Sequence, residues 1–194
     1  MITGPAADRL TGTFQRRIRQ VGDRAARLAA ARWDALGSYD EADVPRYAAQ
    51  TRNTAAAAHA AAVVAGAGYY ATLGQFRPPA VSPRDVPLEL DPREPFIAHW
   101  NALQAHEPWE AAVLSGQARS MAVMRNLAVS SARRAGDVTL RKARQTVDGW
   151  ERRTDAKPCP WCVGVAADVY GSAAAADFGH DRCGCSVVPL ISAA

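Results

Sequence analysis

Apolar residues recur every three or four positions along the first part of the chain, the period of an amphipathic helix. The repeating positions are Phe14, Ile18, Val21, Ala25 and Leu28. The pattern extends from Leu10 to about Leu36, where Gly37 and Ser38 interrupt it. The sequence therefore predicts one long helix with a single apolar face.

A second helix is predicted over Val44–Leu73, with Asp40 or Asp43 as its N-terminal cap. Its middle, Ala55–Ala62, has mostly methyl side chains, so a neighbouring helix can approach closely. Two glycines inside the pattern weaken the prediction for its last turns: Gly66 and Gly68. Together the two helices predict a long helical hairpin over residues 1–75.

Proline dominates the next stretch, residues 76–95. Its six prolines are Pro78, Pro79, Pro83, Pro87, Pro92 and Pro95. Such a density predicts an extended, semi-rigid connector, with a surface arm as one form of it. A helical segment over residues 96–136 follows, with a short apolar stripe and then a longer helix. That helix is predicted to begin at Pro108 and to end near Gly136.

The short apolar stripe consists of Phe96, Ile97, Trp100 and Leu103. The positions predicted to face inward in the longer helix are Val113, Met121, Met124, Leu127 and Ala128. Beyond Gly136 the pattern changes, and Val138–Leu140, Val147–Arg153 and Ser186–Leu190 are each predicted as strands.

The 194 residues fit one or two small domains. No basic-then-apolar leader pattern is found at the N-terminus, and Ala55–Leu73 is too rich in alanine and glycine to predict a membrane span. We therefore expect a soluble protein made in a reducing cytoplasm, with no membrane partner.

Positive charge is concentrated in two helical segments. Residues 9–32 carry seven arginines against one aspartate, and residues 119–153 carry nine basic residues against three acids, so each segment nets +6. Residues 34–118 between them net −5. Two interpretations remain open: the basic segments contact nucleic acid or an acidic protein surface, or they are solvated helix faces that form ion pairs with the acidic middle.

All four cysteines and one histidine lie near the C-terminus with the spacing C-x2-C-x17-H-x2-C-x-C. They are Cys159, Cys162, His180, Cys183 and Cys185. Two half-sites, each with two ligands three residues apart, are typical of a tetrahedral Zn²⁺ site. The first four residues are the predicted ligands, with Cys185 as the alternative to Cys183. Two disulfides would leave His180 unexplained and would need an oxidising compartment.

Four ligands without a carboxylate can close the coordination sphere, which favours a structural zinc over a catalytic one. The Pro158–Cys162 segment matches half of the deaminase pattern, but no H-x-E precedes it. We therefore expect no enzymatic activity. The predicted fold is mainly α, a long helical body with a small C-terminal zinc-binding α+β module, a zinc knuckle, over residues 137–194.

This C-terminal part resembles a known family. Gly149–Arg153, the Cys159–Cys162 half-site and His180–Pro189 together are similar to the C-terminal pattern of Mu F-like minor head proteins, closest to versions from phages of actinobacteria. The similarity covers about the last 45 residues, and the helical remainder fits only in general character. The resemblance implies a low-copy head-morphogenesis protein of a tailed bacteriophage.

The resemblance also implies a location and partners. We expect a virion protein in the head interior, present in the host cytoplasm during assembly, that binds the portal protein, with the major capsid protein as a further candidate and an oligomer around the portal. Candidate contacts with DNA or a partner are Arg152, Arg153 and Arg182. The alternatives are a zinc-stabilised DNA-binding protein and, after it, a zinc-dependent enzyme or toxin.

Overall fold

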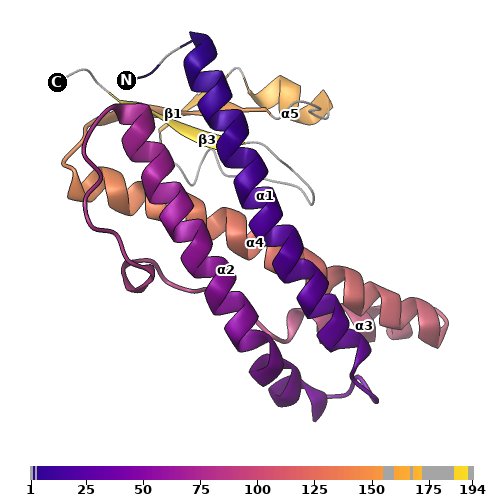
Figure 1. The fold of residues 1–194 in the computed structure, drawn as a ribbon. Helices are drawn as coiled ribbons and strands as arrows, with labels where there is room; N and C mark the ends of the chain where they lie inside the picture. Colours follow the sequence, from indigo (N-terminus) through magenta and orange to yellow (C-terminus); the bar gives the residue numbers. More distant parts are fainter. Residues whose placement is uncertain (1, 3, 155–159, 167, 172–185, 192–194) are drawn as a thin grey trace.

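The computed structural model describes residues 2, 4–154, 160–166, 168–171 and 186–191. The elements are α1 (Gly4–Asp34), α2 (Asp43–Gly74), a single 3-10 turn η1 (Pro83–Asp85), α3 (Glu94–Gln104), α4 (Trp109–Lys142), β1 (Val147–Arg153), α5 (Pro160–Val165), β2 (Val169–Tyr170) and β3 (Ser186–Ile191). The protein is mainly helical with a small three-stranded sheet, so this part of the predicted fold class is confirmed (Figure 1).

Helices α1 and α2 run antiparallel side by side, and α4 crosses behind both of them (Figure 1). Helix α1 begins at Gly4, six residues before the predicted start, because Ala7 is buried against the last turns of α2 and the sheet. Helix α3 packs on α4. Among the helices described, none has both the length and the apolar character needed to cross a bilayer.

The N-cap of α2 is Ala42, with no side-chain cap hydrogen bond, so the prediction of Asp40 or Asp43 as the cap is wrong. Both aspartates instead hold the turn that leads into α2. The Asp40 carboxylate accepts hydrogen bonds from the backbone N–H groups of Ala42 and Asp43, at 3.0 and 3.2 Å. The Asp43 carboxylate accepts bonds from Ser38 and from the Tyr39 N–H, the latter at 2.8 Å. Burial alone would raise the pKa of Asp43, but these bonds and the Arg46 guanidinium hold it below its usual value.

The alanine-rich middle of α2 is packed as its small side chains predicted. Ala55 and Ala62 are 0% exposed, and their clusters are completed by Met124, Leu127 and Ala128 of α4. Met124 is a core residue, as expected. Alanine side chains are short, so they allow the backbones of α2 and α4 to approach closely. The close packing of these two helices therefore follows from the alanine-rich sequence of α2.

Two glycines that weakened or ended the predicted helices instead allow close helix contact. A methyl group on Gly66 of α2 would lie 2.2 Å from the carbonyl oxygen of Ala132, and one on Gly136 of α4 would lie 2.4 Å from the Tyr70 ring. The predicted end of the helix near Gly136 is therefore wrong, and α4 continues to Lys142. The predicted strand Val138–Leu140 is wrong for the same reason, since those residues are helical.

The proline-rich connector contains one short 3-10 turn, η1, and is attached to two helices. The His59 Nε2 atom lies 3.1 Å from the Pro83 carbonyl oxygen, while its Nδ1 lies 2.8 Å from the Ser131 hydroxyl. Lys142 of α4 donates to the Ala80 carbonyl at 2.9 Å and pairs with Asp85 at 3.0 Å. The connector is thus fixed along the bundle and is not a projecting arm.

Strands β1 and β3 form where the sequence predicted them, and the sheet has the order β2-β1-β3 with antiparallel pairs. The sheet packs on the ends of α1, α2 and α4. The Tyr70 hydroxyl of α2 donates to the Val187 carbonyl oxygen of β3 at 2.7 Å. Trp150, Val187 and Val188 share one apolar cluster with Tyr69 and Tyr70, so sheet and helices have a common core.

Candidate functional site

The predicted metal ligands fall mainly outside the described residues, which is where Cys159, His180, Cys183 and Cys185 lie. Cys162 is described: it lies in α5 and is 1% exposed. Within the described ranges, no three histidine, cysteine or acidic side chains are grouped as metal ligands. The four-ligand zinc site therefore stays a prediction, with Cys185 still the alternative ligand.

Antiparallel pairing places the two ends of the cysteine-bearing segment beside each other. Arg153, the last residue of β1, is opposite Ser186, the first residue of β3. The chain therefore leaves β1 and enters β3 at neighbouring backbone positions. The first predicted half-site follows Arg153 in sequence, and the second, His180 and Cys183, ends three residues before Ser186.

Arg152 is buried against α5. Its side chain is 2% exposed, and its guanidinium carbon lies 5.6 Å from the centre of the Trp161 ring, within the range of a cation–π contact. Trp161 itself is 48% exposed. Arg152 thus links β1 to the short helix that carries Cys162.

Arg153 is engaged within the protein by two carboxylates. Its Nε lies 2.6 Å from Glu151, and a terminal nitrogen lies 3.5 Å from Asp8 of α1. Arg182 lies outside the described residues. The roles of Arg152, Arg153 and Arg182 as partner contacts stay predictions.

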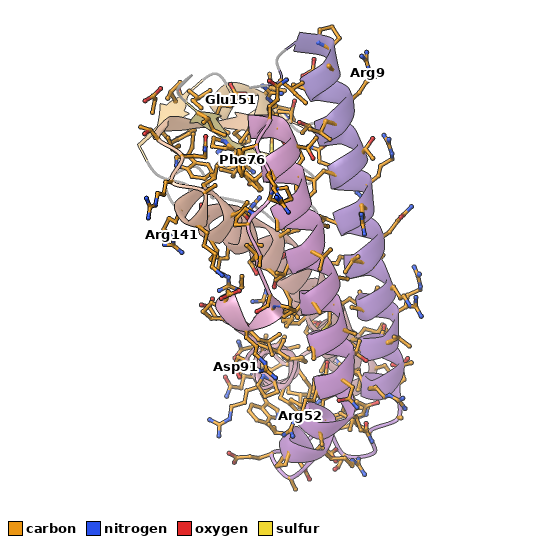
Figure 2. All side chains as sticks on the ribbon, turned by 60° about the vertical axis from the view of Figure 1, so that its left-hand side comes forward. Arg9, Arg52, Phe76, Asp91, Arg141 and Glu151 are labelled. Atoms are coloured by element: carbon orange, nitrogen blue, oxygen red, sulfur yellow. The ribbon has the colours of Figure 1, made fainter. Side chains whose placement is uncertain are left out.

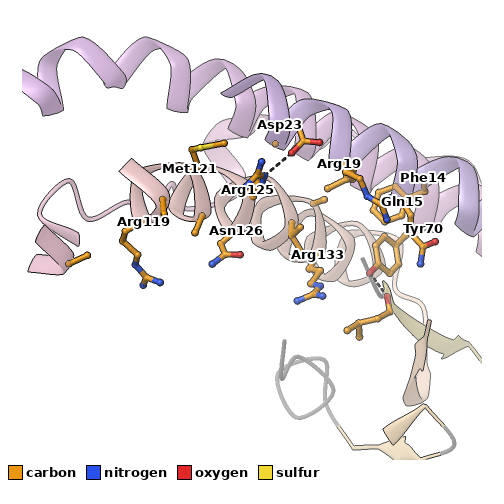
Figure 3. A pocket seen from close by; sticks show the side chains of 18 of the residues that line it. Phe14, Gln15, Arg19, Asp23, Tyr70, Arg119, Met121, Arg125, Asn126 and Arg133 are labelled. Carbon is orange, nitrogen blue, oxygen red and sulfur yellow. Dashed lines mark hydrogen bonds and ion pairs between the residues drawn. The ribbon is translucent and has the colours of Figure 1, made fainter. Parts of the chain in front are cut away.

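A cleft of about 760 Å³ lies between α1 and α4 (Figure 3). Its basic side chains come from both helices: Arg19 from α1, and Arg119, Arg125 and Arg133 from α4. Apolar side chains such as Phe14 and Met121 complete the lining, which includes no histidine or cysteine. The cleft therefore offers positive charge and apolar surface, without a nucleophile paired to a base.

Acidic partners limit the charge that the cleft presents. Arg125 Nε donates to Asp23 at 2.7 Å, a pair that joins α4 to α1 (Figure 3). Arg119 pairs with Glu94 of α3. At the other end of the cleft the Tyr70 hydroxyl is committed to Val187, and burial raises the pKa of Tyr70, so this group stays a neutral donor.

The basic residues of α4 form the ion pairs with the acidic middle that one interpretation of the sequence predicted. Arg119 pairs with Glu94, Arg134 pairs with Glu89, and Lys142 pairs with Asp85. All three acids belong to the net-negative stretch 34–118. For these three of the six basic residues of α4, the ion-paired interpretation is confirmed.

Sequence reasoning identified both basic segments but not the cleft between them. Arg19 and Arg125 are over a hundred positions apart in the sequence, and only the packing of α1 on α4 brings them to one cavity. The sequence signal was the arginine content of each helix, which gives no information about which faces meet. A scan of protein-family models, a search of curated proteins and a search of solved structures found no match to this chain.

Proposed function

We propose that this protein is a structural minor head protein of a tailed bacteriophage, bound to the portal inside the head and acting in head assembly. The C-terminal sequence pattern carries the proposal, from Gly149 through the cysteine and histidine half-sites to Pro189. The pairing of β1 with β3 supports it, because the two outer parts of the pattern are neighbouring strands of one sheet. Pairing of the two outer parts in one sheet supports a shared module better than spacing alone does.

Zinc has a structural role in this proposal. Three thiolates and one imidazole, from Cys159, Cys162, Cys183 and His180, would hold the ion in a closed tetrahedral set. A bound zinc cross-links chain segments and so contributes its binding free energy to folding. The Cys162 side chain is already buried beside the sheet, as a ligand that stabilises the module would need to be.

The proposed partners are the portal protein and, as a second contact, the major capsid protein, with several copies arranged around the portal. The shape of the molecule supports such a role, since a rigid helical bundle with a small sheet at one end can bridge two neighbouring proteins (Figure 1). No catalytic step is proposed.

The test is co-purification of tagged protein with portal and heads from infected cells. We expect the wild-type protein to be recovered with portal and to contain one zinc per chain by metal analysis. Cys159→Ser should lose the zinc and most of the portal association. Cys185→Ser is the matched control, because it removes a neighbouring thiol and should keep both properties.

Two results would count against the proposal. If the wild-type protein is never found with portal or heads, the assembly role fails. If metal-replete protein substituted with cobalt shows an open coordination position, the structural role of the metal fails and a catalytic zinc takes its place.

A further inference from the structure

The outer face of α1 carries arginines that no acidic side chain neutralises. Six of its seven arginines form no ion pair with any described residue: Arg9, Arg16, Arg17, Arg24, Arg27 and Arg32. All six are exposed. The hydrogen bond of Arg16 to Thr13 stays within the helix, at 3.0 Å. This helix therefore presents fixed positive charge to solvent.

The three acids of α1 each contact a neighbouring element. Asp8 pairs with Arg153 of β1 at 3.5 Å, and Asp23 pairs with Arg125 of α4 at 2.7 Å. Asp34 accepts a hydrogen bond from Gln117 of α4 at 2.6 Å. Asp8 and Asp34 are exposed, but all three acids are engaged by other elements and none pairs with the six arginines.

The exposed arginines form a stripe. Arg9, Arg16 and Arg27 are separated by seven and eleven residues, close to two and three full turns, so they share one face; Arg17 and Arg24 lie beside them, again two turns apart. At about 1.5 Å per residue, the stripe from Arg9 to Arg27 is roughly 27 Å long. Figure 2 shows Arg9 on the outer edge of α1, with nitrogen-tipped side chains following below it on the same edge.

The stripe lacks the apolar centre of a protein-binding surface. Stable protein interfaces have an apolar, aromatic-rich core in which charged residues are depleted. On the described part of α1, the single large apolar side chain that is strongly exposed is Leu28, near one end of the stripe, at 45%. A phosphate backbone, in contrast, is bound by charge alone and needs no such core.

We propose that the outer face of α1 binds the phosphate backbone of double-stranded DNA without preference for base sequence. A stripe of about 27 Å spans roughly eight base-pair steps of 3.4 Å. Arginine suits this contact because its guanidinium binds phosphate oxygens in a two-pronged geometry. None of these arginines belongs to the predicted zinc module, and the proposal does not depend on the proposed portal contact.

The experiment measures binding of the full-length protein to a fluorescent 20-base-pair duplex by anisotropy, over a range of salt concentrations. Five phosphate contacts predict a slope of about −4.5 in log K against log salt. The triple variant Arg9→Gln, Arg16→Gln, Arg27→Gln should reduce that slope by about 2.7 and weaken binding at 0.1 M salt by about two orders of magnitude. Glutamine preserves helix propensity, so the helix should remain intact.

The control is a second triple variant with the same change in charge: Arg52→Gln, Arg77→Gln, Arg84→Gln. These three arginines are exposed and form no ion pair with a described residue, but they lie on α2 and the connector, and Figure 2 shows Arg52 at the opposite end of the molecule from Arg9. The control should bind the duplex as the wild type does, within about twofold at equal salt. Circular dichroism should show equal helix content in all three proteins.

Three outcomes would overturn the proposal. The first is no binding of wild-type protein to the duplex at 50 mM salt. The second is equal weakening by the two triple variants, which would mean that net charge alone is responsible. The third is displacement of the duplex by polyglutamate at equal charge concentration, which would assign the stripe to an acidic protein surface. Each result leaves the portal co-purification unaffected, so the two proposals can fail separately.

Discussion

Helices α1 and α4 are similar in length, at 31 and 34 residues, and both are rich in arginine, yet they have different environments. Helix α4 packs against α1, α2 and α3, and its basic side chains pair with acids from other elements. Helix α1 has one side on the bundle and the other in solvent, and the arginines on its solvent side have no acidic partner among the described residues.

The difference shows that the charge of a helix face depends on its neighbours. The acids that neutralise α4 come from the connector and α3, both of which pack on it: Asp85, Glu89 and Glu94. No described acid pairs with the six exposed arginines of α1. Two segments of equal net charge therefore produce one cross-linked interior helix and one basic surface.

The largest expected change in the free energy of unfolding comes from disturbing the close packing of α2 on α4. Gly66→Ala should lower the free energy of unfolding by about 3 kcal/mol, because the added methyl group would meet the Ala132 backbone, which cannot move aside as a side chain could. Chemical denaturation followed by circular dichroism measures this.

Gly68→Ala is the matched control, two residues away in the same helix. Nothing lies within 4 Å of a methyl group at this exposed position, so the variant should be about 0.5–1 kcal/mol more stable than the wild type. Equal effects of the two substitutions would show that α2 and α4 do not pack as closely as described.

A smaller effect is expected for the ion pair that joins the two helices. A double-mutant cycle of Arg125→Gln with Asp23→Asn should give a coupling energy of about 0.5–1 kcal/mol, since both side chains are partly exposed and lie 2.7 Å apart. The coupling should decrease in 1 M NaCl.

The corresponding change on the solvent side of α1 is Arg24→Gln. Because Arg24 has no acidic partner among the described residues, this substitution should change the free energy of unfolding by less than about 0.3 kcal/mol. A loss as large as that of Arg125→Gln would contradict the distinction between the two helices.

A pH dependence of stability is expected from Asp137 of α4. Burial raises the pKa of Asp137 above its usual value, although Arg141 opposes part of the rise. A carboxyl group whose pKa is raised by folding stabilises the protein fully below its unfolded pKa of about 3.9, and this contribution is lost as pH rises through the folded pKa. Asp137→Asn should therefore add about 0.5 kcal/mol at pH 7 and nothing below about pH 4.

The control for this prediction is Glu110→Gln, at the exposed first turn of the same helix. There the helix dipole favours a negative charge, so the substitution should lower stability at pH 7 by about 0.3 kcal/mol. A gain in both variants would mean that net charge, and not the burial of Asp137, sets the effect. Chemical denaturation of both variants at pH 3 and at pH 7 distinguishes these two causes.

Periodicity predicted the elements well where one face is apolar. Helices α1 and α2 and the strands at Val147–Arg153 and Ser186–Leu190 were all recognised because their patterns depend on local alternation. The helix end at Gly136 and the strand at Val138–Leu140 were predicted wrongly. Gly136 lies inside α4 and allows close contact with Tyr70, but the sequence cannot distinguish such a glycine from one that ends a helix. That distinction depends on a residue 66 positions away.

By itself the sequence determined the helical body, the two strands and the set of cysteine and histidine residues that carries the proposed zinc site. These follow from local periodicity and from side-chain chemistry, which any segment of the chain displays on its own. Only the tertiary structure decided that three basic residues of α4 would pair with the acidic middle, that the acids of α1 would contact other elements, and that six arginines of α1 would be exposed with no acidic partner among the described residues. Ion pairing and burial are set by distances between segments far apart in the sequence, and packing alone fixes those distances.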